Sequence, residues 1–263
     1  MAYDTIKVET NDRVCVITLN EPDRLNALSD RMAVEFKGAV EGLKQRSDVR
    51  AVIVTGAGRA FSAGGNFAEM KKNLGGDPAV CKHRIYGFYK SFLSVMDLPV
   101  PTIAAINGPA MGAGACITLA CDMRIAAEGS RIGFAFARIG IHPGMGAEYF
   151  LPRIVGRAKA CELLMTAEEI PAEEALRIGL VNHVAPPEEL MDRAVGLASK
   201  IASRPALPIR MLKESIDAAL ASDLESTLHR EAAYQGICFM TGDMREGIEA
   251  FIEKRKPVFK DEY

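Results

Sequence analysis

Phe61-Ser-Ala-Gly-Gly-Asn66 and Asn107-Gly-Pro-Ala-Met-Gly-Ala-Gly-Ala-Cys116 are the two stretches that decide the fold, since each is a glycine-rich turn behind an apolar run. The runs are Ala51-Val-Ile-Val-Thr55 and Thr102-Ile-Ala-Ala-Ile106. Both lack polar alternation, which is typical of parallel strands buried on two faces. Glycine lets the chain turn tightly and lets a ligand approach the backbone amides. Two such turns, each leading into a helix, predict two N–H groups directed at one oxyanion, an arrangement that suits the enolate of a thioester.

The secondary-structure signals divide the chain into two parts. Up to about Gly156, strand and helix signals alternate, which predicts an α/β fold with substantially parallel pairing. Besides the two runs, we expect strands at 6–10, 14–19 and 123–126 and helices at 29–46, 67–72, 83–96 and 113–120. Beyond Gly156 the strand signals disappear, and helices are expected at 157–165, 172–178, 187–202, 208–221, 224–238 and 243–255. We therefore expect an α/β core with the site over residues 1–200 and a helical region over 201–263.

The bulk composition restricts the class of protein. The chain has 263 residues, 49% hydrophobic and 25% charged, with a formal net charge of -2. This suits a globular protein with a large core and gives no general attraction to nucleic acid. No apolar run approaches the roughly 20 residues of a membrane span, and the amino terminus lacks a secretion-signal pattern. The six cysteines include no C-x-x-C pair, so we expect reduced thiols, a cytoplasmic location and no metal site.

Eight motifs follow one another along the chain. They are Arg24-Leu-Asn-Ala-Leu28, Phe61-Ser-Ala-Gly-Gly65, Ala105-Ile-Asn-Gly108, Cys121-Asp-Met-Arg-Ile-Ala126, Gly140-Ile-His-Pro-Gly144, Leu151-Pro-Arg-Ile-Val-Gly156, Ala172-Glu-Glu-Ala-Leu-Arg-Ile-Gly-Leu-Val-Asn182 and Phe251-Ile-Glu-Lys-Arg-Lys-Pro-Val-Phe259. Together they resemble the enoyl-CoA hydratase/isomerase (crotonase) superfamily. The resemblance implies a crotonase-like (ClpP/crotonase) spiral of ββα units with a helical C-terminal trimerisation region. It also implies a homotrimer or a hexamer (a dimer of trimers), an acyl-CoA thioester substrate, and no cofactor besides the coenzyme A of that substrate.

The resemblance also implies roles for individual residues. Gly65 and Ala113 match the two positions whose amides form the oxyanion hole. Ala113 stands where glycine is common, but the hydrogen bond comes from the backbone. Phe251 and Lys254 match positions that often close the coenzyme A channel from the neighbouring subunit. The residues that would line this channel are Arg24, Leu25, Ala27, Ala63, Asn66 and Phe67.

The chain departs from the superfamily's pattern at its acid–base positions. The two glutamates of hydratases correspond to Cys116 and Phe136, and an acid used by several isomerases corresponds to Gly144. Phenylalanine carries no ionisable proton, and a thiol among apolar neighbours has a raised pKa. Losing a positioned acid–base group removes on the order of 10²–10⁴ in rate. Ordinary syn-hydration of a simple enoyl-CoA is therefore not expected from these positions.

Other ionisable side chains near the turns are candidates for catalysis. Glu148 lies four residues beyond Gly144 and faces the same way one helical turn along, so it is our first choice for a base. The alternative for Glu148 is an ion pair with Arg153 or Arg157. His142 lies in the loop before Gly144, and imidazole is a common acid or base; the alternative is a loop histidine with satisfied hydrogen bonds.

The acyl pocket is expected to be apolar. We expect Cys116 and Phe136 to be packing residues that line it, together with Gly144 and His83, although His83 also suits a helix surface. The main hypothesis is an enzyme that stabilises a thioester enolate for isomerisation, decarboxylation or hydrolysis; Arg138 would hold the carboxylate that a decarboxylase removes. The alternatives are a standard enoyl-CoA hydratase with a displaced base and a non-catalytic subunit that binds coenzyme A thioesters.

Overall fold

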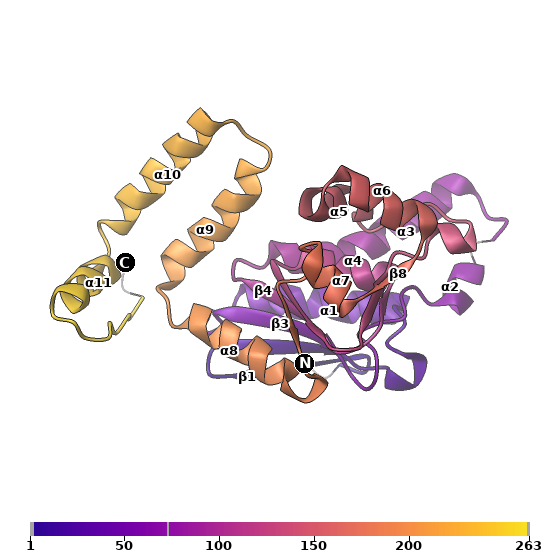
Figure 1. The fold of residues 1–263 in the computed structure, drawn as a ribbon, viewed down its shortest axis with the longest axis horizontal. Coiled ribbons are helices and arrows are strands. Elements are labelled where there is room, and N and C mark those ends of the chain that lie inside the picture. Colours follow the sequence, from indigo (N-terminus) through magenta and orange to yellow (C-terminus); the bar gives the residue numbers. More distant parts are fainter. Residues whose placement is uncertain (1–2, 73, 262–263) are drawn as a thin grey trace.

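The strands form two sheets, and helices cover both faces of the larger one (Figure 1). The structure is a computed structural model that describes residues 3–72 and 74–261. Within these residues the larger sheet has six strands in the order β1-β2-β3-β4-β6-β9, and the smaller has three in the order β5-β7-β8. The bounds are β1 Ile6–Asn11, β2 Val14–Leu19, β3 Ala51–Gly56, β4 Thr102–Ile106, β5 Ala110–Met111, β6 Met123–Ala127, β7 Arg131–Gly133, β8 Glu169–Pro171 and β9 His183–Ala185.

The larger sheet begins with the predicted hairpin of β1 and β2. Its turn places Asp12 and Arg13 at φ of 44° and 70°, which matches the right-handed twist of the strands. The later pairings in this sheet, from β2–β3 to β6–β9, are parallel. Parallel neighbours bring the carboxyl ends of β3 and β4 to one edge, so the two glycine-rich turns lie side by side. The predicted α/β class and the five predicted strands are confirmed.

The helices follow the predicted segments closely. They are α1 Asp30–Lys44, α2 Phe67–Lys71, α3 Pro78–Leu93, α4 Ala113–Ala120, α5 Ala147–Val155, α6 Arg157–Thr166, α7 Ala172–Arg177, α8 Leu190–Ala202, α9 Ala206–Ala219, α10 Leu224–Cys238 and α11 Gly242–Ile252. α1 begins where predicted, because Ser29 Oγ accepts a hydrogen bond from Met32 N at 3.2 Å. α3 begins at Pro78 rather than at the predicted His83, because the Asp77 side chain caps it. In the described part of the chain, no helix is both long and apolar enough to cross a membrane.

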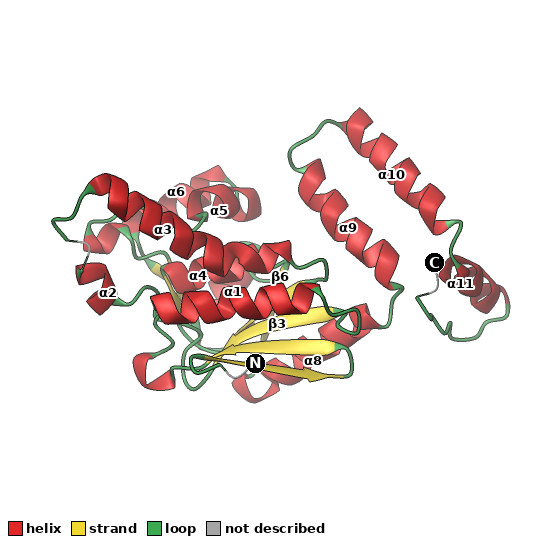
Figure 2. Ribbon diagram, turned by 180° about the vertical axis from the view of Figure 1, so that it is seen from behind, coloured by secondary structure: helices red, strands yellow, loops and turns green. Residues whose placement is uncertain are grey.

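Both faces of the larger sheet are buried, as the apolar runs predict. Val52 and Val54 of β3 point into the main core, which also holds side chains of α1 and α4. Ala51 and Ile53 point to the opposite face, where α8 packs with a buried stripe made mostly of alanine. Figure 2 shows α1 and α3 on the near side of the sheet and α8 behind it. A strand that serves two cores has no polar face, which explains the missing alternation.

Two short strands lie beyond Gly156, so the prediction that strands end there is wrong. β8 pairs antiparallel with β7, and β9 pairs parallel with β6 at the end of the larger sheet. Each has three residues, too few for a periodic pattern to appear in the sequence. Their conformation is fixed by the strand beside them rather than by local preference.

The helices after α8 form a C-terminal arm, α9–α11, that stands away from the sheets (Figures 1 and 2). The arm falls within the region 201–263 for which the sequence predicts helices. α9 and α10 pack against each other as a helical hairpin. Within the described residues α10 has no buried side chain, and its Leu224 and Ile237 are 73% and 49% exposed. The arm therefore presents an apolar surface that the single chain does not cover.

Candidate active site

The first glycine-rich turn presents the amide of Gly65. Gly64 adopts a φ of 93°, a conformation that glycine accepts freely. Leu28 N donates to Gly64 O at 2.7 Å and Asn66 N donates to Leu28 O at 3.0 Å, which makes a parallel bridge between Leu28 and Gly65. In such a bridge the middle residue uses neither its own N–H nor its own C=O. The Gly65 N–H is therefore directed away from Leu28.

The second turn ends at the first residue of α4. Gly112 has a φ of 49°, and its N–H donates to Gly133 O at 2.8 Å, which ties the turn to the smaller sheet. Ala113 follows as the first residue of α4, where an N–H lacks an intrahelical acceptor and lies at the positive end of the helix dipole. Among the described residues, neither Gly65 N nor Ala113 N donates a hydrogen bond within the protein. Two free donors are what an oxyanion hole requires.

The two turns touch each other, and this contact is why they contain glycine. A methyl group on Gly64 would lie 2.7 Å from Met111 O and 3.6 Å from Ala113 N. A methyl group on Gly114 would lie 2.6 Å from Ser62 Cβ. The spacings of 2.7 Å and 2.6 Å are below ordinary van der Waals contact. The close packing brings the free amides of the two turns to the same place.

Asn26 and Asn107 hold the first turn in position, although the sequence motifs do not single them out for this role. Asn26 is fully buried; its Oδ1 accepts from Glu21 N at 2.9 Å, and its Nδ2 donates to Ala57 O at 2.9 Å and Ala60 O at 2.8 Å. Asn107 makes comparable bonds to the same loop from the end of β4. The signal that reveals them is a carboxamide in a loop beside a glycine turn, where its side chain can replace backbone partners.

The segment from Arg24 to Ala27 lies against the first turn, as its assignment to a coenzyme A channel requires. Ala63 N donates to Leu25 O at 2.8 Å, and Ser62 Oγ donates to Asn26 O at 2.8 Å. Leu25 and Asn26 adopt left-handed φ values of 50° and 53°, which bend the segment around the turn. Arg24 is exposed, with Glu21 at 3.7 Å. Its guanidinium is therefore accessible to an anionic ligand.

The other proposed channel residues lie in two places. Asn66 caps α2 by accepting from Ala68 N at 2.9 Å, and Phe67 follows it with 65% of its surface exposed. Phe251 and Lys254 belong to the C-terminal arm, at the opposite end of the molecule from α2 (Figures 1 and 2). Phe251 is 85% exposed. Within one chain the arm residues do not reach the glycine turns.

Cys116, Phe136 and Gly144 gather beside Ala113. Cys116 lies one turn further along α4, is fully buried, and donates from Sγ to Gly144 O at 3.5 Å. Burial raises the pKa of the Cys116 thiol, which disfavours its thiolate form. The Phe136 ring comes within 4.0 Å of where a methyl group on Gly112 would lie. It therefore forms an apolar wall next to the second amide.

Glu148 and His142 flank Gly144 and pair with each other. His142 Nε2 lies 3.0 Å from Glu148 Oε1, and the two side chains are 78% and 58% exposed. His142 Nδ1 lies 2.8 Å from Pro143 O. Both ring nitrogens thus lie beside oxygen atoms, one of Glu148 and one of Pro143. The alternative that Glu148 pairs with Arg153 or Arg157 is wrong: its partner is His142, and Arg153 lies 3.6 Å above the Tyr149 ring instead.

His83 and Arg138 are the two remaining candidates. His83 is exposed on the N-terminal half of α3. Arg138 lies 3.2 Å from Glu169 Oε1 and donates to Ala167 O at 2.9 Å. An arginine held by its own protein is poorly placed to bind a substrate carboxylate, which weakens the decarboxylase hypothesis.

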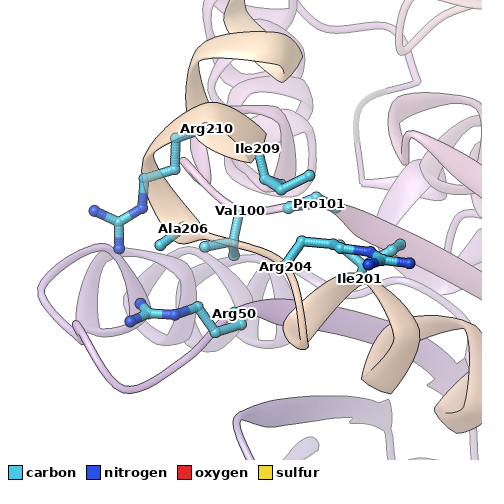
Figure 3. A pocket seen from close by; sticks show the side chains of 8 residues that line it. All are labelled: Arg50, Val100, Pro101, Ile201, Arg204, Ala206, Ile209 and Arg210. Atoms are coloured by element: carbon cyan, nitrogen blue, oxygen red, sulfur yellow. The ribbon is translucent and has the colours of Figure 1, made fainter. Parts of the chain in front are cut away.

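A small cavity lies where the C-terminal arm leaves the body of the molecule (Figure 3). Arg50, Val100 and Arg210 are among its lining residues, and its volume is about 10 Å³, enough for about one water molecule. Arg50 directly precedes β3, and Val100 lies two residues before β4. The cavity is therefore at the amino edge of the parallel strands, opposite the glycine turns, and takes no part in the candidate site.

The family follows from comparison with known proteins. The profile of the family described as enoyl-CoA hydratase/isomerase matches residues 9–262. The chain belongs to the enoyl-CoA hydratase/isomerase family. Its fold is crotonase-like: the solved enoyl-CoA hydratase of Bacillus anthracis superposes with a TM-score of 0.92 at 36% identity, covering 98% of this chain and 100% of that one. The fold expected from the motifs is confirmed.

Relatives within the enoyl-CoA hydratase/isomerase family carry hydratase names. The chain is 38% identical over 262 residues to the crotonyl-CoA hydratase of Syntrophomonas wolfei, covering 98% of this chain and 99% of the relative. It is 39% identical over 259 residues to the short-chain-enoyl-CoA hydratase of Clostridium acetobutylicum, covering 97% of each. These names favour the hydratase alternative over the isomerase, decarboxylase or hydrolase hypothesis.

Proposed function

We propose that this protein hydrates the double bond of an enoyl-CoA thioester, with Glu148 and His142 as a displaced acid–base pair. The observation that carries the proposal is their 3.0 Å contact beside Gly144. A carboxylate oriented by an imidazole is a common acid–base unit. The hydratase names of the relatives support the reaction, and the free amides of Gly65 and Ala113 support an enolate intermediate.

In the proposed reaction the thioester oxygen lies between the amides of Gly65 and Ala113. Water attacks C3, the Glu148 carboxylate accepts a water proton, and the π electrons of the double bond move towards the thioester oxygen. Both amides bind more strongly as negative charge develops there, and this difference lowers the barrier. The exposure of Glu148 and His142 suits groups that take their water from solvent.

The proposal assigns the acyl group to the apolar space beside Cys116 and Phe136. Neither residue supplies an acid or a base, because the thiol is buried with a raised pKa and the phenyl ring has no ionisable proton. Coenzyme A would lie along Arg24, Leu25 and Ala27, with the remaining channel residues Ala63, Asn66 and Phe67 opposite. The reaction needs no cofactor besides the coenzyme A of the substrate.

The C-terminal arm supports assembly as a homotrimer or a hexamer. Its exposed apolar residues include Leu212, Leu224, Leu228, Phe239, Phe251 and Ile252. Burying such side chains between subunits is favourable by about 25 cal/mol per Å² of apolar surface. In this assembly Phe251 and Lys254 would close the coenzyme A channel of a neighbouring subunit, since they do not reach the channel of their own.

Mass spectrometry of acyl-CoAs incubated with the protein in ¹⁸O-labelled water tests the proposed reaction. The panel contains short, branched and cyclic enoyl-CoAs together with malonyl- and β-ketoacyl-CoAs. We expect an enoyl-CoA to gain one labelled water. Loss of carbon dioxide or movement of the double bond without hydration would contradict the proposal. If no thioester that binds is converted, the protein is a binding subunit.

Replacing the base tests the assignment of Glu148. Glu148→Gln keeps the shape and removes the carboxylate, so we expect kcat to fall by about 10²–10⁴ with the thermal unfolding temperature unchanged. The matched control is Glu225→Gln, because Glu225 also pairs with a histidine, His229, at 3.3 Å on an exposed helix face of the arm. Equal activity of the two variants would remove Glu148 from the mechanism.

A further inference from the structure

Helix α3 places the hydroxyl group of Tyr89 in a space that exists because residue 144 is glycine. A methyl group on Gly144 would lie 2.5 Å from Tyr89 Cζ and would overlap the hydroxyl oxygen. Gly144 is buried and Tyr89 is half-buried. The phenol therefore occupies the position at which a side chain on residue 144 would begin.

The Tyr89 phenol and Cys116 adjoin the same residue. Cys116 Sγ donates to Gly144 O at 3.5 Å, and the Tyr89 ring and hydroxyl are the nearest atoms to a Cβ placed on Gly144. Cys116 lies one helical turn from Ala113, the source of one of the free amides. The Tyr89 hydroxyl thus adjoins the apolar space to which the proposed function assigns the acyl group.

Tyr89 carries an ionisable proton, unlike Phe136 and Gly144 beside it. Burial raises the pKa of the Tyr89 phenol above its usual 10.0. The phenol therefore stays protonated at neutral pH and acts as a donor rather than a base. Among the described residues the Tyr89 hydroxyl has no hydrogen-bond partner in the protein. A half-buried hydroxyl in this state gains free energy when a ligand or water satisfies it.

We propose that Tyr89 is a catalytic proton donor that delivers its phenolic proton to C2 of the enolate. The inference rests on the proposed hydration. Water oxygen bonds to C3 while Glu148 takes one of its protons, and the enolate electron pair then forms the C2–H bond with the Tyr89 proton. The phenolate regains a proton from the Glu148 carboxyl group through water. The net change is addition of H and OH across the double bond, with both residues restored.

The chemistry of this step is favourable. A phenol is a far stronger acid than the α-C–H of a thioester, so proton transfer from Tyr89 to the enolate runs downhill. Gly65 and Ala113 hold the enolate oxygen during the transfer. The two proton transfers thus belong to different groups. The exposed Glu148 takes the proton from water, and the half-buried Tyr89 donates the proton to C2.

The decisive variants change the acidity of Tyr89 while keeping its shape. Incorporation of 3-fluorotyrosine or 3,5-difluorotyrosine at position 89 makes the phenol progressively more acidic. If its proton is transferred in a rate-limiting transition state, kcat changes in a graded series with phenol acidity. Tyr89→Phe, which keeps the ring in the Gly144 niche, should lower kcat by about 10²–10³ and change KM less than about threefold.

Controls separate catalysis from packing and from failure of the hydration proposal. Tyr86→Phe removes a hydroxyl from the same helix, 63% exposed, and should retain wild-type kcat. Gly144→Ala should expel the phenol and reproduce the loss of Tyr89→Phe. A wild-type kcat in Tyr89→Phe, or a flat fluorotyrosine series, would overturn the role of Tyr89 alone. A wild-type protein that hydrates no enoyl-CoA would overturn the hydration and this role together.

Discussion

At the scale of single residues, Gly64 meets a backbone requirement that other amino acids do not. Its φ of 93° is unfavourable for any L side chain, and a Cβ there would lie 2.7 Å from the backbone oxygen of Met111. Strain and collision together should cost about 2–5 kcal/mol. We predict that Gly64→Ala lowers the unfolding temperature by on the order of 10 °C and abolishes acyl-CoA binding, measured by calorimetry.

Gly42 provides the matched control for that substitution. It lies inside α1, and a methyl group placed on it would meet no atom within 4 Å. Gly42→Ala should therefore stabilise the protein by about 0.5–1 kcal/mol through helix propensity. A loss of stability in Gly42→Ala as large as that in Gly64→Ala would show that the turn geometry is not the cause.

Some contacts between single residues cannot be predicted from the sequence. The apolar character of Cys116 and Phe136 follows from their neighbours along the chain, and the structure buries both. The approach of Tyr89 to Gly144 does not follow, because the two residues are far apart in the sequence and meet only when α3 packs over the site. The pairing of Glu148 with His142 does not follow either, since the sequence suggests Arg153 or Arg157 as the partner.

At the scale of elements, two side chains connect the loop after β3 to its neighbours. Asn26 is fully buried and satisfies Glu21 N and the carbonyls of Ala57 and Ala60. Each buried polar group left without a partner costs about 1–3 kcal/mol. We predict that Asn26→Ala destabilises the protein clearly more than Asn107→Ala, whose bonds are partly exposed. Chemical denaturation of both variants measures the difference, and equal losses would contradict it.

The elements themselves differ in how well the sequence predicts them. β3 and β4 are long apolar runs followed by glycine, so their position and burial could be predicted, as could α1 with its Ser29 cap. β5, β8 and β9 have two or three residues each, and they exist as strands only because a neighbouring strand completes their hydrogen bonds. The predicted start of α3 is wrong because the capping signal of Asp77 and Pro78 precedes a long exposed first half with little periodicity.

At the scale of the whole molecule, the site and the C-terminal arm lie at separate ends. The glycine turns are at the carboxyl edge of the sheet, while α9–α11 extend beyond its amino edge (Figure 1). One chain therefore presents an open site at one end and an uncovered apolar surface at the other. Association of several chains covers the apolar surface and can carry the arm of one subunit to the site of another.

A mixing experiment tests whether arm and site act between subunits. We predict that Lys254→Ala raises the KM for acyl-CoA by about tenfold, as expected for the loss of a contact worth about 1.4 kcal/mol, whereas the nearby Lys256→Ala does not. Subunits carrying Lys254→Ala and subunits carrying Glu148→Gln are each impaired. Assembled together, they form some sites in which an intact Glu148 meets an intact Lys254 from the neighbour, so activity should recover. If mixed assemblies, verified by mass spectrometry, show only the average of the two variants, Lys254 does not serve a neighbouring site.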